Sequence, residues 1–139
     1  IAIHYSFYSY VASVVEVSVL DDKLKVHKIF TVADCGTVVN QNTVRAQLEG
    51  AAVFGLSLAL FGNITAREGR IVQANYHDYE MLRIHQTPEI QIEVVQSEDL
   101  PTGIGEPGVP VIAPALINAI FDATGKRFRS LPLKAHGLV

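Results

Sequence analysis

The chain has 139 residues, of which 49% are apolar and 18% charged, and its formal net charge is −3. This length suits one domain with a buried core. Its Lys and Arg residues are dispersed rather than clustered, which argues against a nucleic-acid partner. The single cysteine, Cys35, excludes an internal disulfide and any zinc or iron–sulfur site built from several cysteines. The high apolar content suggests that some apolar surface belongs against a partner.

The first residues, Ile-Ala-Ile-His-Tyr-Ser, resemble the middle of a strand and carry no secretion signal, so we expect a truncated sequence. Residues 10–20 are rich in β-branched side chains, and Val15 and Val17 share one face at strand period. Asp21-Asp22 predicts a turn, and the alternation over residues 24–33 predicts a returning strand. We therefore expect a β-hairpin.

A helix is predicted next, with Asn40 or Asn42 as its cap and its end near Phe61. Its apolar part is shorter than the roughly 20 residues that a bilayer requires, so we expect a core helix and no membrane span. Gly50 and Gly55 each cost about 1 kcal/mol in a helix relative to Ala. Close packing of another backbone is the commoner reason for such glycines, and a nearby ligand is the other.

The second half of the chain contains shorter elements. Segments 63–66 and 71–74 flank a turn, residues 75–85 are irregular, and residues 89–95 alternate as a half-exposed strand with one acidic face.

A second helix is predicted from Pro110 to Gly125, because prolines open it and a glycine closes it. Residues 126–133 resemble a final short strand, followed by a tail. This order indicates an α+β fold, with a β-hairpin and a short mixed sheet packed with two main helices. No linker divides residues 1–139.

The loop Gly103-Ile-Gly-Glu-Pro-Gly108 matches the spelling G-x-G-x-x-G of dinucleotide-binding loops. That fingerprint needs a strand running into the glycines and an acidic residue at the end of a second strand. Here Pro101 interrupts the preceding segment, and Asp122 lies within the predicted helix. The context therefore disfavours a nucleotide site.

Glu106 is the carboxylate of this loop. Pro107 biases it toward extended geometry, and the flanking glycines let the backbone approach a bound group, which would suit a general base. A solvent-exposed glutamate in a Gly/Pro turn is the more common meaning of this pattern. The residues alone do not favour the base over the exposed turn.

Three stretches carry a family resemblance. The segment from Gly103 through Arg127, with Arg129-Ser-Leu-Pro132 after it, resembles the closing segment of the xanthine oxidase/aldehyde oxidase family of molybdenum hydroxylases. Val44-Arg-Ala-Gln-Leu-Glu-Gly50, preceded by Asp34 to Asn40, resembles the family segment whose glutamine contacts the pterin cofactor. Asn75-Tyr-His-Asp-Tyr79 and Met81-Leu-Arg83 resemble the branch of isoquinoline 1-oxidoreductase and related bacterial aldehyde dehydrogenases.

This resemblance implies a role for each matching residue. Glu106 would be the catalytic base beside molybdenum, and Gln47 would contact the pterin through an amide that both donates and accepts hydrogen bonds. Gly105 and Gly108 would shape the backbone around the ligands of the metal, and Gly50 would let chain and cofactor approach. No protein metal ligand is expected, because the histidines show no ligand spacing.

The resemblance also implies partners. The chain would be the C-terminal portion of a domain that binds a molybdopterin-type molybdenum cofactor. Its partners would be the remainder of a large subunit and a two-cluster iron–sulfur small subunit, and the substrate a nitrogen heterocycle or an aldehyde oxidised with oxygen from water. The alternative is a noncatalytic fragment or interaction domain, inactive without the missing lobes.

Overall fold

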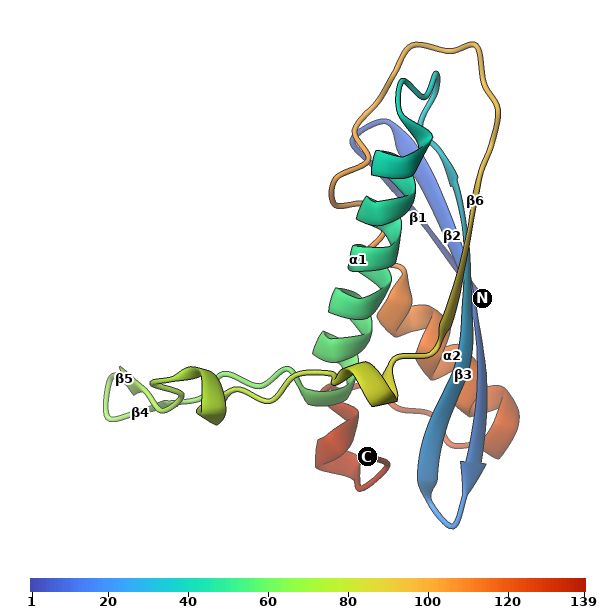
Figure 1. Cartoon of the computed structure of the whole chain (residues 1–139). Coiled ribbons are helices and arrows are strands. Elements are labelled where there is room, and N and C mark those ends of the chain that lie inside the picture. The colour runs from blue at the N-terminus through green and yellow to red at the C-terminus, as the bar shows by residue number, and fades with distance from the viewer.

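The computed structural model describes all residues, 1–139, and its main body is a four-stranded sheet with two helices on one face (Figure 1). The strand order is β1-β2-β3-β6. The first three strands are antiparallel, and β6 runs parallel to β3. The mixed sheet and two main helices confirm the predicted α+β class. The bounds are β1 Ala2–Ser6, β2 Ser9–Leu20, β3 Lys23–Asp34, β6 Glu89–Val94, α1 Gln41–Phe61 and α2 Ile112–Thr124.

The predicted hairpin is β2 and β3, joined at Asp21 and Asp22. Both aspartates have positive φ, 50° and 58°, a conformation that Asp tolerates better than most residues. The turn between β1 and β2 has the same left-handed geometry at Phe7 and Tyr8, with φ of 53° and 61°. Bulky aromatic residues adopt it only where the surroundings hold them there.

Helix α1 begins as the capping pattern predicts. The Oδ1 of Asn40 accepts a hydrogen bond from the Thr43 amide at 3.0 Å, so Asn40 rather than Asn42 is the cap. Arg45 donates from Nη1 to the carbonyl oxygen of Ile92 at 2.7 Å, which ties the helix to β6. By length and composition, α1 is long and apolar enough to cross a membrane. However, 56% of its most apolar 18-residue stretch is buried in the fold. It is a core helix, as expected.

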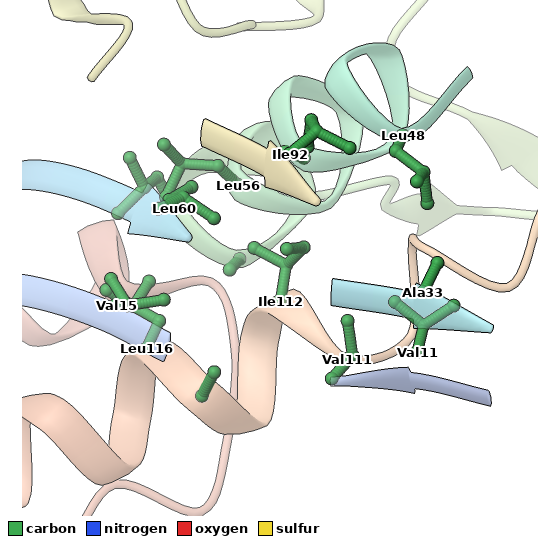
Figure 2. Packing of buried hydrophobic residues seen from close by; sticks show 14 of the residues in the cluster. Val11, Val15, Ala33, Leu48, Leu56, Leu60, Ile92, Val111, Ile112 and Leu116 are labelled. Atoms are coloured by element: carbon green, nitrogen blue, oxygen red, sulfur yellow. The ribbon is translucent and has the colours of Figure 1, made fainter. Parts of the chain in front are cut away.

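The core lies between the sheet and the two helices (Figure 2). Alternate residues of β2 and β3 point inward, including Val11, Val15 and Ile29, which are 5% exposed or less. They meet Leu56 of α1 and Leu116 of α2, both fully buried. The apolar periodicity of the chain therefore places both helices on the same face of the sheet.

Helix α2 begins at Ile112, two positions later than expected, and ends at Gly125, whose φ of 71° suits a helix C-terminus. The predicted strand over residues 126–133 is wrong. Arg127 stacks over the ring of Phe121 at 3.6 Å and donates to Asn118, so this segment folds back on its own helix. Pro132 also lacks an amide for strand pairing. The tail forms the short helix η3, Leu133–His136.

The chain between α1 and β6 forms an arm that projects from the body at β4 and β5 and returns to it before β6, where Leu82 packs against the core (Figure 1). The expected turn near residues 67–70 is present, but its strands are only β4, Ala66–Arg67, and β5, Arg70–Ile71. Two short 3₁₀ helices follow, η1 (Tyr76–Asp78) and η2 (Ile84–Gln86), within the segment expected to be irregular.

Candidate active site

The loop that carries Glu106 crosses one end of the sheet, beside the residues that follow β3. The Thr37 amide donates to the carbonyl of Asp99 and the Thr102 amide to the carbonyl of Cys35, each at 2.9 Å. Gly36 makes this approach possible, because a Cβ there would lie 2.1 Å from the carbonyl oxygen of Leu100. No strand runs into the glycines, which agrees with the rejection of a nucleotide site.

The far end of the loop rests on α1. Pro107 is fully buried, and Gly108 is buried beside it. A Cβ on Gly108 would lie 2.8 Å from the Cβ of Ala51 and 3.1 Å from Leu48 Cδ2. Gly108 is therefore required for the close packing of loop against helix.

The middle of the loop lies against the exposed side of α1. A Cβ on Gly105 would be 3.6 Å from Nε2 of Gln47, so the amide and the loop backbone are neighbours. Gly50 follows Gln47 by three positions, which places both on one helix face. No atom lies within 4 Å of a Cβ built on Gly50. Gln47, Gly50, Gly105 and Glu106 are all exposed, and together we call them the site wall.

Glu106 itself sits in a turn, where its carbonyl accepts the amide of Val109 at 3.0 Å. Its carboxylate takes part in none of the ion pairs of the chain, which join Lys28–Glu89, Arg67–Glu68, His77–Asp78, Lys126–Asp22 and Lys134–Glu80. The chain contains no group of three or more His, Cys, Asp or Glu side chains that could hold a metal ion.

Asp34 serves the turn after β3, and Cys35 serves packing. Asp34 Oδ1 accepts the amide of Gly36 at 3.2 Å. Cys35 is 4% exposed, and burial, followed by the nearby charge of Asp34, raises the pKa of its thiol. Gly55 likewise serves packing, because a Cβ there would lie 2.9 Å from the Cβ of Ile112.

Ser9 was missed at the sequence level. Its Oγ lies 2.7 Å from Thr102 Oγ1 and 2.7 Å from the carbonyl oxygen of Gly103. The available signal was a serine in register with the inward, apolar positions of β2, where Val11 and Val15 are buried. A buried polar side chain needs a hydrogen-bond partner, but the sequence does not show which residue that partner is.

The sequence profile of the molybdopterin cofactor-binding domain matches residues 2–88. The chain belongs to this family. The resemblance to molybdenum hydroxylases of the xanthine oxidase/aldehyde oxidase family is thereby confirmed, and with it the kind of cofactor that the domain family binds.

Two curated relatives show the same family. One is a membrane-bound aldehyde dehydrogenase of Gluconacetobacter polyoxogenes, and the name of that enzyme includes pyrroloquinoline quinone. It is 46% identical over 107 residues, which are 77% of this chain and 14% of that protein. Isoquinoline 1-oxidoreductase subunit beta of Brevundimonas diminuta is 36% identical over 114 residues, 82% of this chain and 15% of that protein. The chain thus spans about one seventh of the length of these relatives.

Solved structures agree. The aldehyde oxidoreductase of Desulfovibrio desulfuricans superposes with a TM-score of 0.75 at 28% identity, over 89% of this chain and 14% of that one. Quinoline 2-oxidoreductase of Pseudomonas putida 86 shares the fold, with a TM-score of 0.72 at 23% identity over 79% of this chain and 15% of that one.

The site wall fits a cofactor with a polar heterocycle. The Gln47 amide is exposed beside the backbone of Gly105, and open space lies over Gly50. An amide can donate and accept at once, and glycines admit close approach of a flat group. Glu106 follows Gly105 directly in the chain and is exposed as well.

Proposed function

We propose that this chain forms one wall of the active site of a molybdenum hydroxylase, with Glu106 as the base. The observation that carries the proposal is the approach of the Glu106 loop to Gln47, 3.6 Å between Nε2 and the Cβ position of Gly105. Gln47 and the Glu106 loop are far apart in the sequence, and the family resemblance implies a role for each. Their approach supports a shared exposed surface.

When bound, the molybdenum cofactor supplies the redox chemistry by which oxygen from water is added to a substrate carbon. The chain itself contributes position and proton transfer. Gln47 would hold the pterin through its amide, while Gly50 and Gly105 leave room for close approach. Glu106 would accept a proton on a carboxylate oxygen, and the fixed ends of its loop would keep that oxygen in reach.

The substrate we propose is a nitrogen heterocycle or an aldehyde. The names of two relatives, an aldehyde dehydrogenase and an isoquinoline oxidoreductase, support these two classes. The site wall does not discriminate between a heterocycle and an aldehyde, because it forms only one side of a pocket.

We further propose that residues 1–139 are the C-terminal portion of the domain and act with the remainder of a large subunit and an iron–sulfur small subunit. The much greater length of the relatives supports the first partner. So does the outward face of the sheet, which neither helix covers (Figure 1). Large side chains on that face remain exposed, namely Ile3, Tyr5, Tyr10, Val14 and Phe30.

Glu106→Gln in the full subunit is the direct test of the base. We expect an unchanged molybdenum content and a loss of turnover of at least about 100-fold, because the amide keeps the shape but cannot accept the proton. Steady-state hydroxylation and metal analysis measure both quantities. Glu98→Gln, at another exposed glutamate ahead of the same loop, is the matched control and should remain active. Near-normal turnover of Glu106→Gln would refute the assignment.

Gln47→Ala should lower cofactor occupancy as well as turnover, because it removes the amide from the wall while leaving α1 helical. Metal analysis and extraction of the pterin from the purified full subunit measure the occupancy. Gln41→Ala, at an exposed glutamine in the first turn of the same helix, should leave it unchanged. Full occupancy in Gln47→Ala would remove Gln47 from the site.

A further inference from the structure

The turn between β1 and β2 grips the loop that carries Glu106. Ser9, which is fully buried, lies 2.7 Å from both Thr102 Oγ1 and the carbonyl oxygen of Gly103. A hydroxyl has one hydrogen to donate. If Ser9 donates it to the Gly103 carbonyl, it can accept the hydroxyl of Thr102, and both bonds are satisfied together.

Gly103 is held on its other side by Phe7. The Gly103 amide donates to the carbonyl oxygen of Phe7 at 3.1 Å. A Cβ on Gly103 would lie 2.7 Å from the Cβ of Phe7, so the two backbones touch. Both polar backbone groups of Gly103 are therefore bonded to residues 7–9, which we call the clamp.

The clamp has an unfavourable backbone of its own. Phe7 and Tyr8 both have positive φ, 53° and 61°, in a region that bulky residues rarely adopt. The two residues are 55% and 81% exposed, so burial of their side chains does not explain the conformation. A two-residue hairpin loop of this kind requires positive φ at both central residues. The bonds from this turn to Gly103 and Thr102 add to the contacts that hold it in place.

Glu106 lies between two fixed points. The clamp holds Gly103 on one side, and Pro107 and Gly108 are buried against α1 on the other. Between these points, Ile104 packs partly buried against the core, whereas Gly105 restrains its own backbone little. The position of the Glu106 carboxylate thus depends on both anchors.

We infer that Ser9, with the Phe7 carbonyl, is a positioning residue that sets the place of the Glu106 carboxylate. This inference rests on the proposed function, in which Glu106 is the base. Ser9 touches no reacting group and acts through Thr102 and Gly103 alone.

Ser9→Ala in the full-length holoenzyme tests the inference, with Ser13→Ala as the matched control. Ser13 is also fully buried on β2, and its Oγ also bonds a threonine, Thr31, at 2.8 Å, but it does not touch the loop. We expect Ser9→Ala to lower kcat about 10-fold, while KM and molybdenum content stay within about 2-fold, because misplacement of a base slows chemistry more than binding. Ser13→Ala should leave kcat within about 2-fold of the parent.

Hydrogen exchange of the holoenzyme supplies a readout that does not depend on turnover. Exchange of the amides of residues 102–106 should quicken several-fold in Ser9→Ala and remain unchanged in Ser13→Ala. Thr102→Val, at a half-buried position that tolerates an isosteric change, should show a smaller effect of the same kind and covers the case in which Ser9→Ala does not fold.

The outcomes separate the clamp from the base. If Glu106→Gln is inactive while Ser9→Ala and Thr102→Val match Ser13→Ala in kcat and in loop exchange, the clamp is wrong and the base stands. Equal loss of kcat in Ser9→Ala and Ser13→Ala also overturns the clamp. Near-normal turnover of Glu106→Gln overturns both.

Discussion

Gly50 and Gly55 lie five positions apart on α1, but Gly55 is closely packed and Gly50 faces open space. A Cβ on Gly55 would lie 2.9 Å from both the Cβ of Ile112 and the carbonyl oxygen of Val109, whereas nothing lies within 4 Å of one on Gly50. Sequence reasoning offered close packing or a nearby ligand for both glycines. The surroundings support packing at Gly55 and leave space for a ligand at Gly50.

The two alanine variants should therefore behave in opposite ways. Gly55→Ala should destabilise the chain by about 1–3 kcal/mol through overpacking, and Gly50→Ala should stabilise it by up to about 1 kcal/mol through helix propensity. Chemical denaturation measures both changes. In the full subunit, Gly50→Ala should nevertheless lower molybdenum content if the cofactor uses that space. A stable variant with full occupancy would exclude Gly50 from the site.

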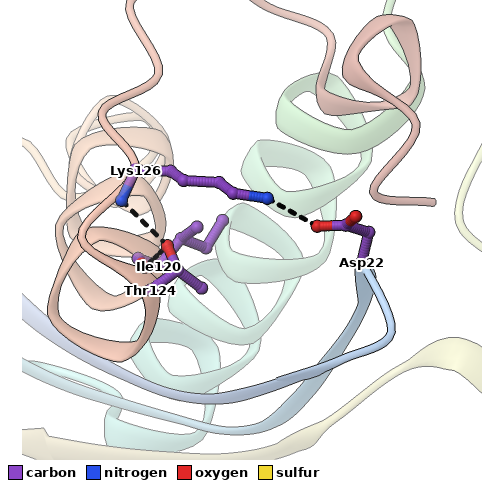
Figure 3. Close-up of polar contacts among 4 residues, drawn as sticks. All are labelled: Asp22, Ile120, Thr124 and Lys126. Carbon is purple, nitrogen blue, oxygen red and sulfur yellow. Dashed lines mark hydrogen bonds and ion pairs between the residues drawn. The ribbon is translucent and has the colours of Figure 1, made fainter.

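At the scale of elements, one ion pair joins the β2–β3 turn to the segment that follows α2 (Figure 3). Lys126 Nζ lies 2.7 Å from Asp22 Oδ1. Thr124 positions this lysine, because its Oγ1 accepts the Lys126 amide at 3.1 Å and donates to the Ile120 carbonyl at 2.7 Å. The hydrogen bond from Lys126, followed by its charge, lowers the pKa of Asp22 below the ordinary 3.8.

This shift gives the ion pair a definite pH dependence. A lowered pKa in the folded state means that the contribution of Asp22 is present above pH 3.8 and is lost as the pH falls through the folded value. Asp22→Asn should therefore reduce the stability of the chain slightly near neutral pH and not at all in strong acid. The difference should shrink at high salt, because the pair is exposed. Asp21→Asn, beside it in the same turn, is the control for thermal unfolding across pH.

The helices and strands show which local sequence signals are enough to predict an element. Helix α1 and strands β2, β3 and β6 were predicted to within a residue or two, because period and capping are local properties. The strand expected over residues 126–133 failed because the segment contacts the helix that directly precedes it. Contacts of Arg127 with Phe121 and Asn118 on α2 outweigh a weak strand pattern.

At the scale of the whole molecule, the site wall is open and the outward face of the sheet exposes several large apolar side chains. One wall rarely supplies enough binding energy to retain a large cofactor. We therefore expect the isolated chain to purify without molybdenum and to show no turnover, as metal analysis and a hydroxylation assay would show. Molybdenum copurifying with the isolated chain in stoichiometric amount would contradict this and would mean that the wall suffices.

The sequence by itself determined the fold class, most of the elements and the family, because these depend on periodicity, caps and contiguous motifs. It also singled out Glu106 and Gln47 as separate candidates through the family resemblance. Only the tertiary structure decided that Gln47 lies against the Glu106 loop, that Gly108 packs on α1, and that Ser9 holds Gly103 from 94 positions away. These contacts join distant segments, and their partners are chosen by the packing of helices on the sheet rather than by any local pattern.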